Sequence, residues 1–402
     1  PLVLGWTLAM IAGWRAVQPD GKPRHWLLVG LAMGFGFLNK YSAAYQIVSG
    51  ALFFALWKPA RVHLRKPGPY LALFVFAVCT LPVVIWNAQH DWISASHIAD
   101  NAALGKVWRP TLRYFWEFLG SELGLLNPVF FLAALWASVA FWRWRHERPL
   151  WLYFFCMGGP VFLGHVAYSL HSRILPNWIA PAVLPLFCLM VAYWDARWRA
   201  GWRAGKRWLV AGMTLGVLAV VLLHESNLIS KLAGRALPGE MDPLRRVRAW
   251  KESTAIVEVA RRKLEVEGTP TFLIADHYGM TGLFTFYLPA ARESAVPLVY
   301  PRSSPYPKNQ FYFWPEYRYR SNRRGQNAIY VAEVGPYALE KGWLWKWLIG
   351  REVNYAGINR SLMAPVWLTE EFEKVTDLGG YEVKLGGRVF RRLQLFECRN
   401  LR

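Results

Sequence analysis

Side chains that could bind phosphate or sugar groups stand at the ends of apolar segments in the first half of this chain. They fall in three places: Lys40 and Tyr41; Asn87, His90, Asp91 and His97; and Arg173, Asn177 and Trp178. A lysine ammonium is a compact point charge that suits a phosphate, and an arginine guanidinium can hold a phosphate through two hydrogen bonds. His and Asp side chains can orient sugar hydroxyls, and a Trp ring can stack on a sugar. These residue types could therefore contact phosphate and sugar groups.

Each of these groups also has an ordinary structural explanation. A lysine in an apolar segment costs about 2.5–3.5 kcal/mol at the membrane centre, so Lys40 needs a partner or extends its ammonium to the interface. The segment 87–100 can be a solvated loop with capping carboxylates, and its His and Asp spacing matches no known metal-ligand pattern. Arg173 and Trp178 can be ordinary residues of an interfacial turn. Both interpretations stay open for all three places.

The segments that carry these residues are long apolar runs, concentrated in the first 224 residues. Crossing a hydrocarbon layer takes about 20 helical residues, and several runs are long enough. Tryptophans mark the run edges, as in an interfacial aromatic belt: Trp57, Trp86, Trp92, Trp142, Trp151, Trp178, Trp194 and Trp208. The pattern predicts a polytopic helical membrane protein with about eight helices, at 1–15, 26–40, 42–57, 70–87, 119–142, 150–170, 176–195 and 207–224.

The net charge of +21 reflects topology more than a nucleic-acid partner. Fifteen basic residues lie in alternate loops: Arg15, Lys22, Arg24, Lys58, Arg61, Arg65, Lys66, Arg143, Arg145, Arg148, Arg197, Arg199, Arg203, Lys206 and Arg207. The intervening loops carry five: Lys40, Lys106, Arg109, Arg113 and Arg173. Basic loops stay in the cytoplasm, so segment 88–117 and everything after residue 224 are expected outside it. Glu117 and Glu122 are expected to pair with Arg113 or Lys40.

After residue 224 the composition changes, which divides the chain into a membrane domain (1–224), a connector (225–249) and an extracytoplasmic α/β domain (250–402). An amphipathic helix is predicted after Trp250, with Ile256, Val259, Ala260 and Leu264 on its apolar face. Strands are predicted at 271–275 and 328–332, a helix up to residue 287, and a hairpin over 381–396. This order of elements indicates a small α/β domain.

Two further features of this domain could contact ligands. Asp276-His277-Tyr278 follows a predicted strand, where open α/β sheets bind ligands, although turn formation explains it equally. The basic and aromatic segment 309–324 could lie against anionic headgroups or simply be solvated.

The chain opens at Pro1 inside an apolar helix, so upstream sequence is expected. The cysteines Cys79, Cys156, Cys188 and Cys398 form no disulfide framework.

Six short motifs in order resemble a known family. They are Gly34-Phe-Gly-Phe-Leu-Asn-Lys40-Tyr41, Leu81-Pro-Val-Val-Ile-Trp-Asn87-Ala-Gln-His90-Asp91-Trp92, Gly124-Leu-Leu-Asn-Pro128, Leu175-Pro-Asn177-Trp178-Ile-Ala-Pro-Ala, Ala275-Asp276-His-Tyr278 and Phe286-Tyr-Leu-Pro289. Together they resemble bacterial membrane glycosyltransferases of family 39, which include protein O-mannosyltransferases and the aminoarabinose transferase that acts on lipid A. The resemblance runs from Pro1 to about residue 315.

The resemblance implies a GT-C membrane fold in the bacterial inner membrane and an inverting transfer of sugar from a polyprenyl-phosphate donor. The acceptor would be extracytoplasmic: lipid A, an envelope glycan or a protein. The family's catalytic acid lies in the first external loop, which places it upstream of Pro1, so this chain offers no catalytic residue. No cofactor is firmly implied, although a divalent metal is possible. The alternative is a non-catalytic envelope protein or a translocase of lipid-linked glycans, but the chain lacks the repeat symmetry typical of transporters.

Overall fold

The structure is a computed structural model of the chain and describes every residue except 335–337, 340–341, 352–354 and 357–362. The chain forms two compact units, Pro1–Val217 and Leu218–Arg402. The first unit, described throughout, is helical, and the second contains a mixed β-sheet with helices on both faces.

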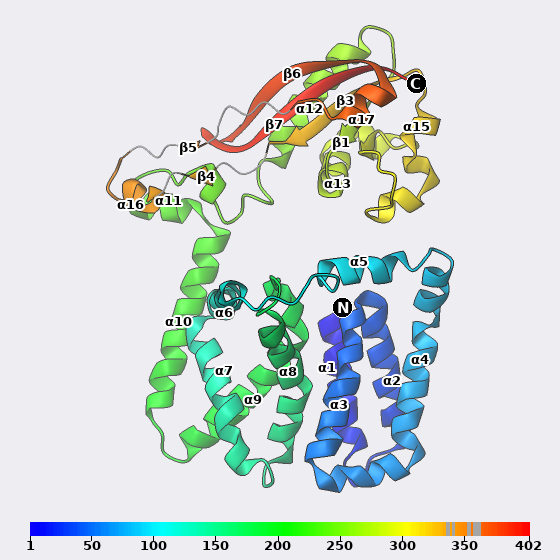
Figure 1. Cartoon of the computed structure of the whole chain (residues 1–402). Coiled ribbons are helices and arrows are strands. Elements are labelled where there is room, and N and C mark those ends of the chain that lie inside the picture. The colour runs from blue at the N-terminus through cyan, green and yellow to red at the C-terminus, as the bar shows by residue number, and fades with distance from the viewer. Residues whose placement is uncertain (335–337, 340–341, 352–354, 357–362) are drawn as a thin grey trace. The chain divides into compact units, whose positions relative to one another are not determined.

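The first unit is made of helices, most of which run up and down (Figure 1). They are α1 (Leu2–Ala16), α2 (Pro23–Asn39), α3 (Tyr45–Leu56), α4 (Pro67–Ala88), α5 (Ile93–Asn101), α6 (Leu112–Leu125), α7 (Pro128–Ala140), α8 (Pro149–Tyr168), α9 (Ala180–Arg199) and α10 (Ala204–His224). The 3-10 turns between them are η1 (Tyr41–Ala44), η2 (Lys58–Arg65), η3 (Phe141–Trp144) and η4 (Pro176–Ile179). Proline opens α2, α4, α7 and α8, because its fixed φ suits the first helical residue and its missing N–H costs nothing there.

Glycines bring α2 close to both of its neighbours. A Cβ on Gly5 of α1 would lie 2.9 Å from the Gly36 Cα, and a Cβ on Gly30 would lie 2.5 Å from the Ala72 carbonyl oxygen of α4. Contact through small residues is how helices associate where lipid removes the hydrophobic driving force. The packing of α1, α2 and α4 is therefore of a kind that suits a membrane.

Among the described residues, four helices are long and apolar enough to cross a membrane: Gly68–Ala88, Pro149–Tyr168, Pro176–Arg199 and Ala204–His224. The pair α6 and α7 would make a fifth span, while α1 and α3 are apolar but shorter. Large apolar side chains on these helices, such as Phe74 and Val210, are exposed, as expected of a lipid-facing surface. The prediction of a polytopic helical protein is confirmed, and each of the eight predicted segments contains a helix.

The single helix predicted over 119–142 is wrong. The chain bends by 113° between α6 and α7. Asn127 has a φ of 68°, and its side-chain oxygen accepts a hydrogen bond from the Val129 N–H at 3.1 Å, so it caps the new helix that Pro128 begins. Proline cannot continue the preceding helix, because it lacks the N–H and its ring clashes with the previous turn. The apolar residues on both sides of Asn127 concealed this break.

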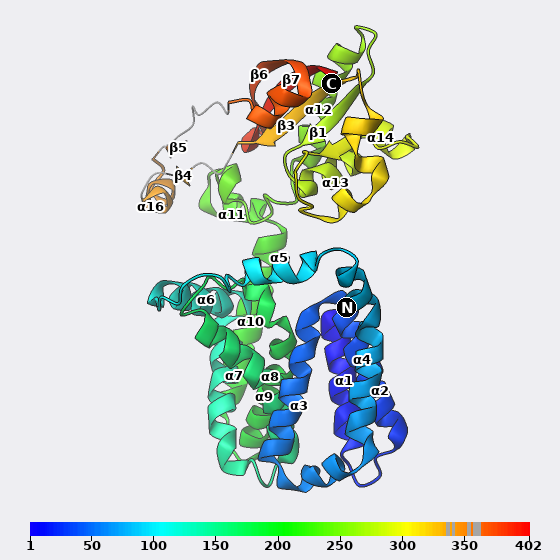
Figure 2. The ribbon, with the colours of Figure 1, turned by 45° about the vertical axis from the view of Figure 1, so that its right-hand side comes forward.

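The connections predicted to be basic all lie at one end of the first unit. The α1–α2, α3–α4, α7–α8 and α9–α10 connections are at the lower end in Figure 1, and α2–α3, α4–α5 and α8–α9 are at the upper end. The short helix α5 lies across the upper end (Figure 2). All three places that carry the predicted binding residues are therefore at the same end.

The second unit is built on a five-stranded sheet with the order β2-β1-β3-β7-β6. The strands are β1 (Thr271–Ala275), β2 (Val299–Pro301), β3 (Asn327–Glu333), β6 (Phe372–Leu385) and β7 (Arg388–Leu401), while β4 (Ala338–Leu339) pairs with β5 (Tyr355–Ala356) apart from the sheet. Strands β2, β1 and β3 are parallel, and β7 is antiparallel to both β3 and β6. The predicted strands at 271–275 and 328–332 and the C-terminal hairpin are confirmed.

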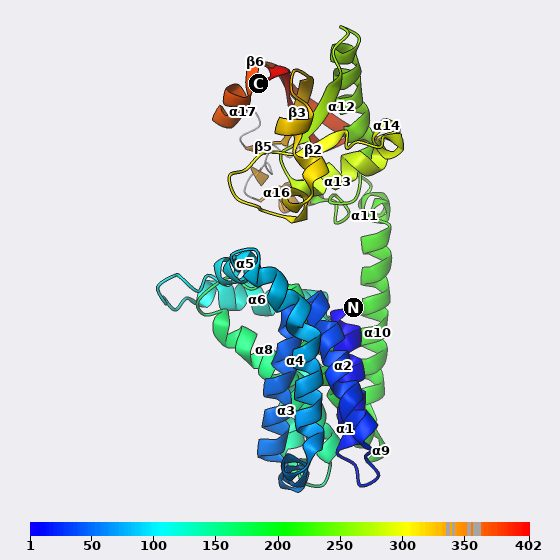
Figure 3. The same cartoon turned by 90° about the vertical axis from the view of Figure 1, so that its right-hand side faces the viewer.

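Helices cover both faces of this sheet. The helices of the second unit are α11 (Asn227–Ala233), α12 (Trp250–Glu265), α13 (Tyr278–Tyr287), α14 (Pro289–Glu293), α15 (Tyr319–Asn322), α16 (Trp343–Leu348) and α17 (Val366–Glu371), with 3-10 turns η5 (Gly239–Met241), η6 (Gln310–Phe313) and η7 (Pro315–Tyr317), and not all of them lie on the sheet. Figure 3 shows α12 and α17 on opposite sides of β3. Leu273 packs in the core with Val257 of α12, whereas its neighbour Phe272 packs with Leu368 of α17, as strand alternation requires.

The predicted apolar face of α12 is wrong in one position. Val259 is 70% exposed, whereas Val257 is completely buried. The inner face also carries Arg261, which is 4% exposed and forms ion pairs with Glu258 and Glu265, each at 2.7 Å. A buried, paired arginine in the middle of the helix shifts the face from the one that the apolar residues indicate.

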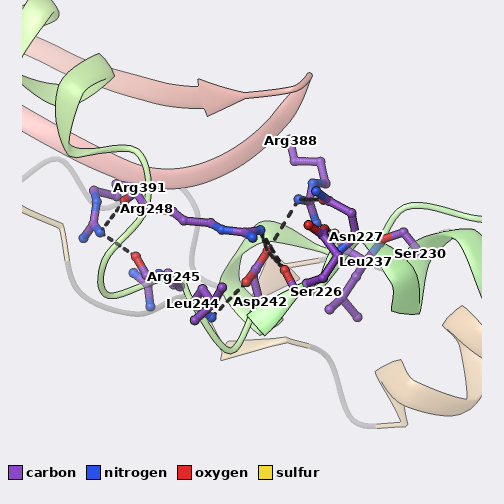
Figure 4. Close-up of polar contacts among 11 residues, drawn as sticks. Ser226, Asn227, Ser230, Leu237, Asp242, Leu244, Arg245, Arg248, Arg388 and Arg391 are labelled. Carbon is purple, nitrogen blue, oxygen red and sulfur yellow. Dashed lines mark hydrogen bonds and ion pairs between the residues drawn. The ribbon is translucent and has the colours of Figure 1, made fainter. Parts of the chain in front are cut away.

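The predicted connector 225–249 packs against the C-terminal hairpin through polar contacts (Figure 4). The Asp242 carboxylate is completely buried and accepts from Ser226 at 2.9 Å, Arg248 at 3.1 Å and Arg388 of β7 at 3.5 Å. Arg391 of β7 donates to the Arg248 carbonyl at 2.8 Å. These contacts include this segment in the core of the second unit.

Candidate functional site

Lys40 lies where α2 breaks off at the upper end of the first unit. It is the residue after the helix, in extended conformation (φ −158°, ψ 128°), and its N–H donates to the Gly36 carbonyl at 2.9 Å. The side chain is exposed, and within residues 1–217, all of which are described, it forms no ion pair. The expected pairing of Lys40 with Glu117 or Glu122 is therefore absent, and the ammonium is available to an anion.

Aromatic side chains from three elements meet around His165 of α8 at the same end of the unit. The His165 ring centroid lies 6.2 Å from that of Tyr45 of α3 and 6.4 Å from that of Trp178 in η4. Trp178 is half-buried, and Asn177 beside it is exposed. The structure thus brings Tyr45 and Trp178, 133 positions apart in sequence, around one histidine.

Sequence reasoning missed His165 and Tyr45. A histidine inside an apolar helix is itself a signal, because ionisable groups in such segments usually face the bundle interior or a water-filled cavity. Its Nδ1 lies 2.7 Å from the Val161 carbonyl oxygen of the preceding turn, which fixes the ring direction and leaves Nε2 for another partner. Tyr41, which was predicted, instead packs against Phe37, with ring centroids 5.0 Å apart and a tilt of 31° between the rings.

The α4–α5 turn is shaped by its own polar side chains. Asn87 is 4% exposed, donates to the Val83 carbonyl at 2.9 Å and accepts from the Ser94 N–H at 3.2 Å. The His90 ring stacks on Trp86 with centroids 4.1 Å apart. Asp91 and Trp92 have φ angles of 52° and 54°, a left-handed conformation that costs about 1 kcal/mol or more per residue. The Asn87 amide is thus engaged in holding a strained turn.

The remaining predicted residues of this end are exposed or paired. The His97 Nε2 lies 2.9 Å from the Asn101 amide nitrogen in α5. Arg173 lies 3.9 Å from the Glu117 carboxylate, which also pairs with Arg113 at 3.0 Å, as predicted. Pairs this exposed contribute about 0–1 kcal/mol, so the Arg173 guanidinium can be released to another anion at little cost.

Glu122 of α6 differs from its neighbours because its carboxylate is completely buried. Neither carboxylate oxygen has a hydrogen-bond partner among the described residues, and the preceding turn of the helix carries Phe118, which is 1% exposed. A buried carboxylate without a partner destabilises the fold.

We therefore expect Glu122→Gln to leave the melting temperature of the detergent-solubilised protein unchanged or to raise it. The corresponding gain in the free energy of unfolding is at most about 1–3 kcal/mol. The neutral amide occupies the same volume and carries no charge to desolvate. Glu117→Gln, which removes only exposed ion pairs, is the matched control and should change stability by less than about 1 kcal/mol. A fall of several degrees for Glu122→Gln alone would show that the carboxylate is held by a partner that needs its charge.

The predicted ligand positions of the second unit serve the turn after β1. His277 caps α13, since its Nδ1 accepts from the Gly279 N–H at 3.1 Å. Asp276 accepts from Arg302 at 2.8 Å and from the Tyr330 hydroxyl at 2.9 Å, and both burial and this carboxylate raise the pKa of Tyr330. Among the described residues, no three His, Cys, Asp or Glu side chains come together as a metal site.

Comparisons with known proteins bear on this site. The sequence model of the family described as dolichyl-phosphate-mannose-protein mannosyltransferase matches residues 1–86. The chain is 32% identical to the lipid A galacturonosyltransferase RgtD of Rhizobium johnstonii over 157 residues, which cover 39% of this chain and 32% of that protein. It is 29% identical to the undecaprenyl phosphate-alpha-4-amino-4-deoxy-L-arabinose arabinosyl transferase of Pseudomonas savastanoi over 211 residues, 46% of this chain and 35% of that protein. It is also similar to the crystal structure of ArnT from Cupriavidus metallidurans in the apo state, with a TM-score of 0.47 and 14% identity over 98% of this chain and 73% of that chain.

The family match and the matches to curated sequences confirm the predicted resemblance to membrane glycosyltransferases. The family match includes Lys40 and Tyr41, and the matched curated relatives are sugar transferases by name. The chain spans about a third of the length of the curated relatives it matches.

Proposed function

We propose that this chain works as a membrane glycosyltransferase that moves a sugar from a polyprenyl-phosphate donor to lipid A or another envelope acceptor. The observation that carries the proposal is the exposed Lys40 ammonium, which forms no ion pair within residues 1–217. It lies at the end of the helical unit opposite to the basic connections, where Trp178 also lies. The similarity to transferases whose names give undecaprenyl phosphate and lipid A as their substrates supports this choice of donor and acceptor.

In the proposed reaction, an acceptor hydroxyl or phosphate oxygen attacks the anomeric carbon from the face opposite to the donor phosphate. The new C–O bond forms as the old one breaks, the polyprenyl phosphate leaves with the electron pair, and the configuration inverts. Negative charge develops on the leaving phosphate, and an ammonium aimed at it stabilises the transition state more than the ground state. Lys40 supplies this charge, Trp178 and Asn177 contact the sugar, and Arg173 is a second phosphate ligand once released from Glu117.

The turn between α4 and α5 forms the neighbouring wall of the proposed site. There, Asn87 holds the turn in shape, while His90, Asp91 and His97 stay predicted contacts of the sugar or the acceptor. The proton of an attacking hydroxyl would pass to a carboxylate, and we assign this role to no residue of the chain.

The test is to incubate the complete natural protein in detergent with polyprenyl phosphates that carry labelled mannose, aminoarabinose or galacturonic acid. Extracted lipid A, envelope polysaccharide and protein serve as separate acceptors. Label appearing in one acceptor class, with release of polyprenyl phosphate, is the expected result. If label stays on the donor while reconstituted vesicles move it to the opposite leaflet, the chain is a translocase of lipid-linked glycans.

We also propose that the end with the basic connections faces the cytoplasm, because basic loops are retained there. We expect Ser172→Cys, in the α8–α9 turn, to react with an impermeant maleimide in intact spheroplasts. Asp20→Cys, in the α1–α2 connection, should react only after permeabilisation. The reverse pattern would invert the proposed topology, and the unmodified chain gives the background from its four cysteines.

A further inference from the structure

A cavity of about 790 Å³ opens in the second unit beside the carboxyl end of β2. Five arginines line it: Arg302, Arg318, Arg320, Arg324 and Arg402. Most of them belong to the segment 302–324, which runs from the end of β2 to α15 and is yellow in Figure 1. Neither the expected catalytic end of the helical unit nor the relatives' names assign a role to this cavity.

The fold places the cavity where parallel sheets commonly bind ligands. Arg302 directly follows β2 and Asp276 directly follows the parallel strand β1, so both lie at the carboxyl edge of the sheet. Their ion pair at 2.8 Å fixes the Arg302 guanidinium. The Tyr312 hydroxyl donates to the Arg302 carbonyl at 2.7 Å and anchors the following segment to the same edge.

A buried carboxylate holds the segment that lines the cavity, but it does not neutralise the positive charge of the arginines. Glu371 of α17 has a side chain that is 6% exposed, and it accepts from the hydroxyls of Ser303 and Tyr319, each at 2.5 Å. Arg320 lies 3.5 Å from it but keeps 71% of its side chain exposed. The side chains of Arg318 and Arg324 form no hydrogen bond or ion pair with any described residue. The cavity therefore holds more positive than negative charge.

Aromatic rings form the other wall. Phe311, Tyr312 and Tyr317 line the cavity, and the rings of Phe311 and Tyr317 lie 4.7 Å apart at a tilt of 55°. Burial raises the pKa of Tyr312 and of Tyr317, so both rings are neutral donors at physiological pH. Guanidinium groups that converge on a concave space suit a phosphate, and half-buried aromatic rings beside them offer a flat surface for a sugar ring.

We propose that this cavity binds a carbohydrate that carries a phosphate group. The phosphate lies among Arg318, Arg320 and Arg324, and the sugar ring packs on the aromatic wall. A flat layer of lipid headgroups would instead need basic side chains projecting from a convex surface, whereas these line a hollow. The inference rests on the cavity alone, so it stands or falls separately from the proposed transfer reaction.

The test measures binding of glucosamine 1-phosphate, glucosamine and inorganic phosphate to the full chain in neutral detergent by isothermal titration calorimetry. We expect glucosamine 1-phosphate to bind more tightly than either of the other two. The double variant Arg318→Gln/Arg324→Gln should bind it about tenfold more weakly or worse, because it loses two charge-assisted contacts. Arg292→Gln, an exposed arginine of α14 outside the cavity, is the matched control and should bind as the wild type does.

Three results would overturn the proposal. If inorganic phosphate binds as tightly as glucosamine 1-phosphate, the carbohydrate contributes nothing to binding and the ligand is an anion only. Wild-type binding by the double variant, with an unchanged melting temperature, would place the ligand elsewhere. If nanodiscs containing phosphatidylglycerol, but not those of phosphatidylcholine, abolish binding in the wild type, the arginines bind lipid headgroups.

Discussion

Replacing Lys40 with alanine is expected to lower the turnover of sugar transfer by about a hundredfold or more in the complete natural protein. The ammonium follows the end of α2, at the same end of the unit as Trp178, and has no carboxylate partner within residues 1–217. Removing one preorganised group that stabilises a developing oxyanion costs about 10²–10³ in rate, because the charge is needed most in the transition state. The assay is transfer of label from a polyprenyl-phosphate sugar, with kcat and KM measured separately.

Lys106→Ala is the matched control for this effect. Lys106 lies in the connection between α5 and α6 at the same end of the unit, is also exposed, and belongs to none of the proposed contacts. We expect this variant to keep near wild-type turnover, and Lys40→Arg to keep a part of it, since a guanidinium retains the charge with different geometry. If Lys40→Ala keeps wild-type turnover, Lys40 does not bind the donor phosphate. A rise in KM at constant kcat would limit its role to ground-state binding.

Hydropathy and breaker residues predicted the helical unit well where each helix is bounded by its own signals. The predicted helix 70–87 matches α4, whose start is marked by Pro67, and 150–170 matches α8, which starts at Pro149. The segment 119–142 failed because Asn127 and Pro128 interrupt a run that stays apolar on both sides. A single asparagine before proline changes mean hydropathy little, but it ends the hydrogen-bond ladder.

The site was predicted only in part, because its members meet through tertiary packing. Residue type and position at a helix end indicated Lys40 and Trp178. That Trp178 meets His165 and Tyr45 depends on how α3, α8 and η4 pack, which periodicity does not determine. Local chemistry explains other positions: an asparagine near a helix end was predicted to contact ligand, yet the Asn87 amide is bound to the backbone of its own turn.

In the second unit the strands were predictable and their assembly was not. The run Thr271–Ala275 is buried on both faces and was identified from its apolar residues. The basic segment 309–324 gave no indication of a concave shape, because the arginines line a cavity only through the anchoring of this segment to the edge of the sheet. The segment 225–249 resembled a linker by composition, but Arg245 donates to the Phe390 carbonyl of β7 at 3.0 Å and Asp242 pairs with Arg388 of β7 at 3.5 Å.

Asp242→Ala is expected to destabilise the second unit by about 3–5 kcal/mol, because it leaves buried arginines without their counter-charge. The Asp242 side chain is completely buried, and those of Arg248 and Arg388 are 20% and 14% exposed, so solvent screens these pairs little. The segment around Ser226 and the start of β7, at Arg388, both depend on this carboxylate (Figure 4). Hydrogen exchange of the full chain in detergent, followed by mass spectrometry, should show faster exchange in peptides from 225–248 and from β7, while α8 and α9 stay protected.

The comparison that isolates the charge is between this variant and two others. Asp195→Ala removes an ion pair of similar length, 2.8 Å to Arg199, that is exposed, so it should change exchange and melting temperature little. Asp242→Ala/Arg248→Ala removes one of the stranded charges, and we expect it to lose less stability than the two single changes added together, since the two residues interact directly. If Asp242→Ala behaves like Asp195→Ala, the hydrogen bonds from Arg248 to Ser226 and from Arg388 to Leu237 and Asn227 are sufficient to hold the segment, and the carboxylate adds nothing.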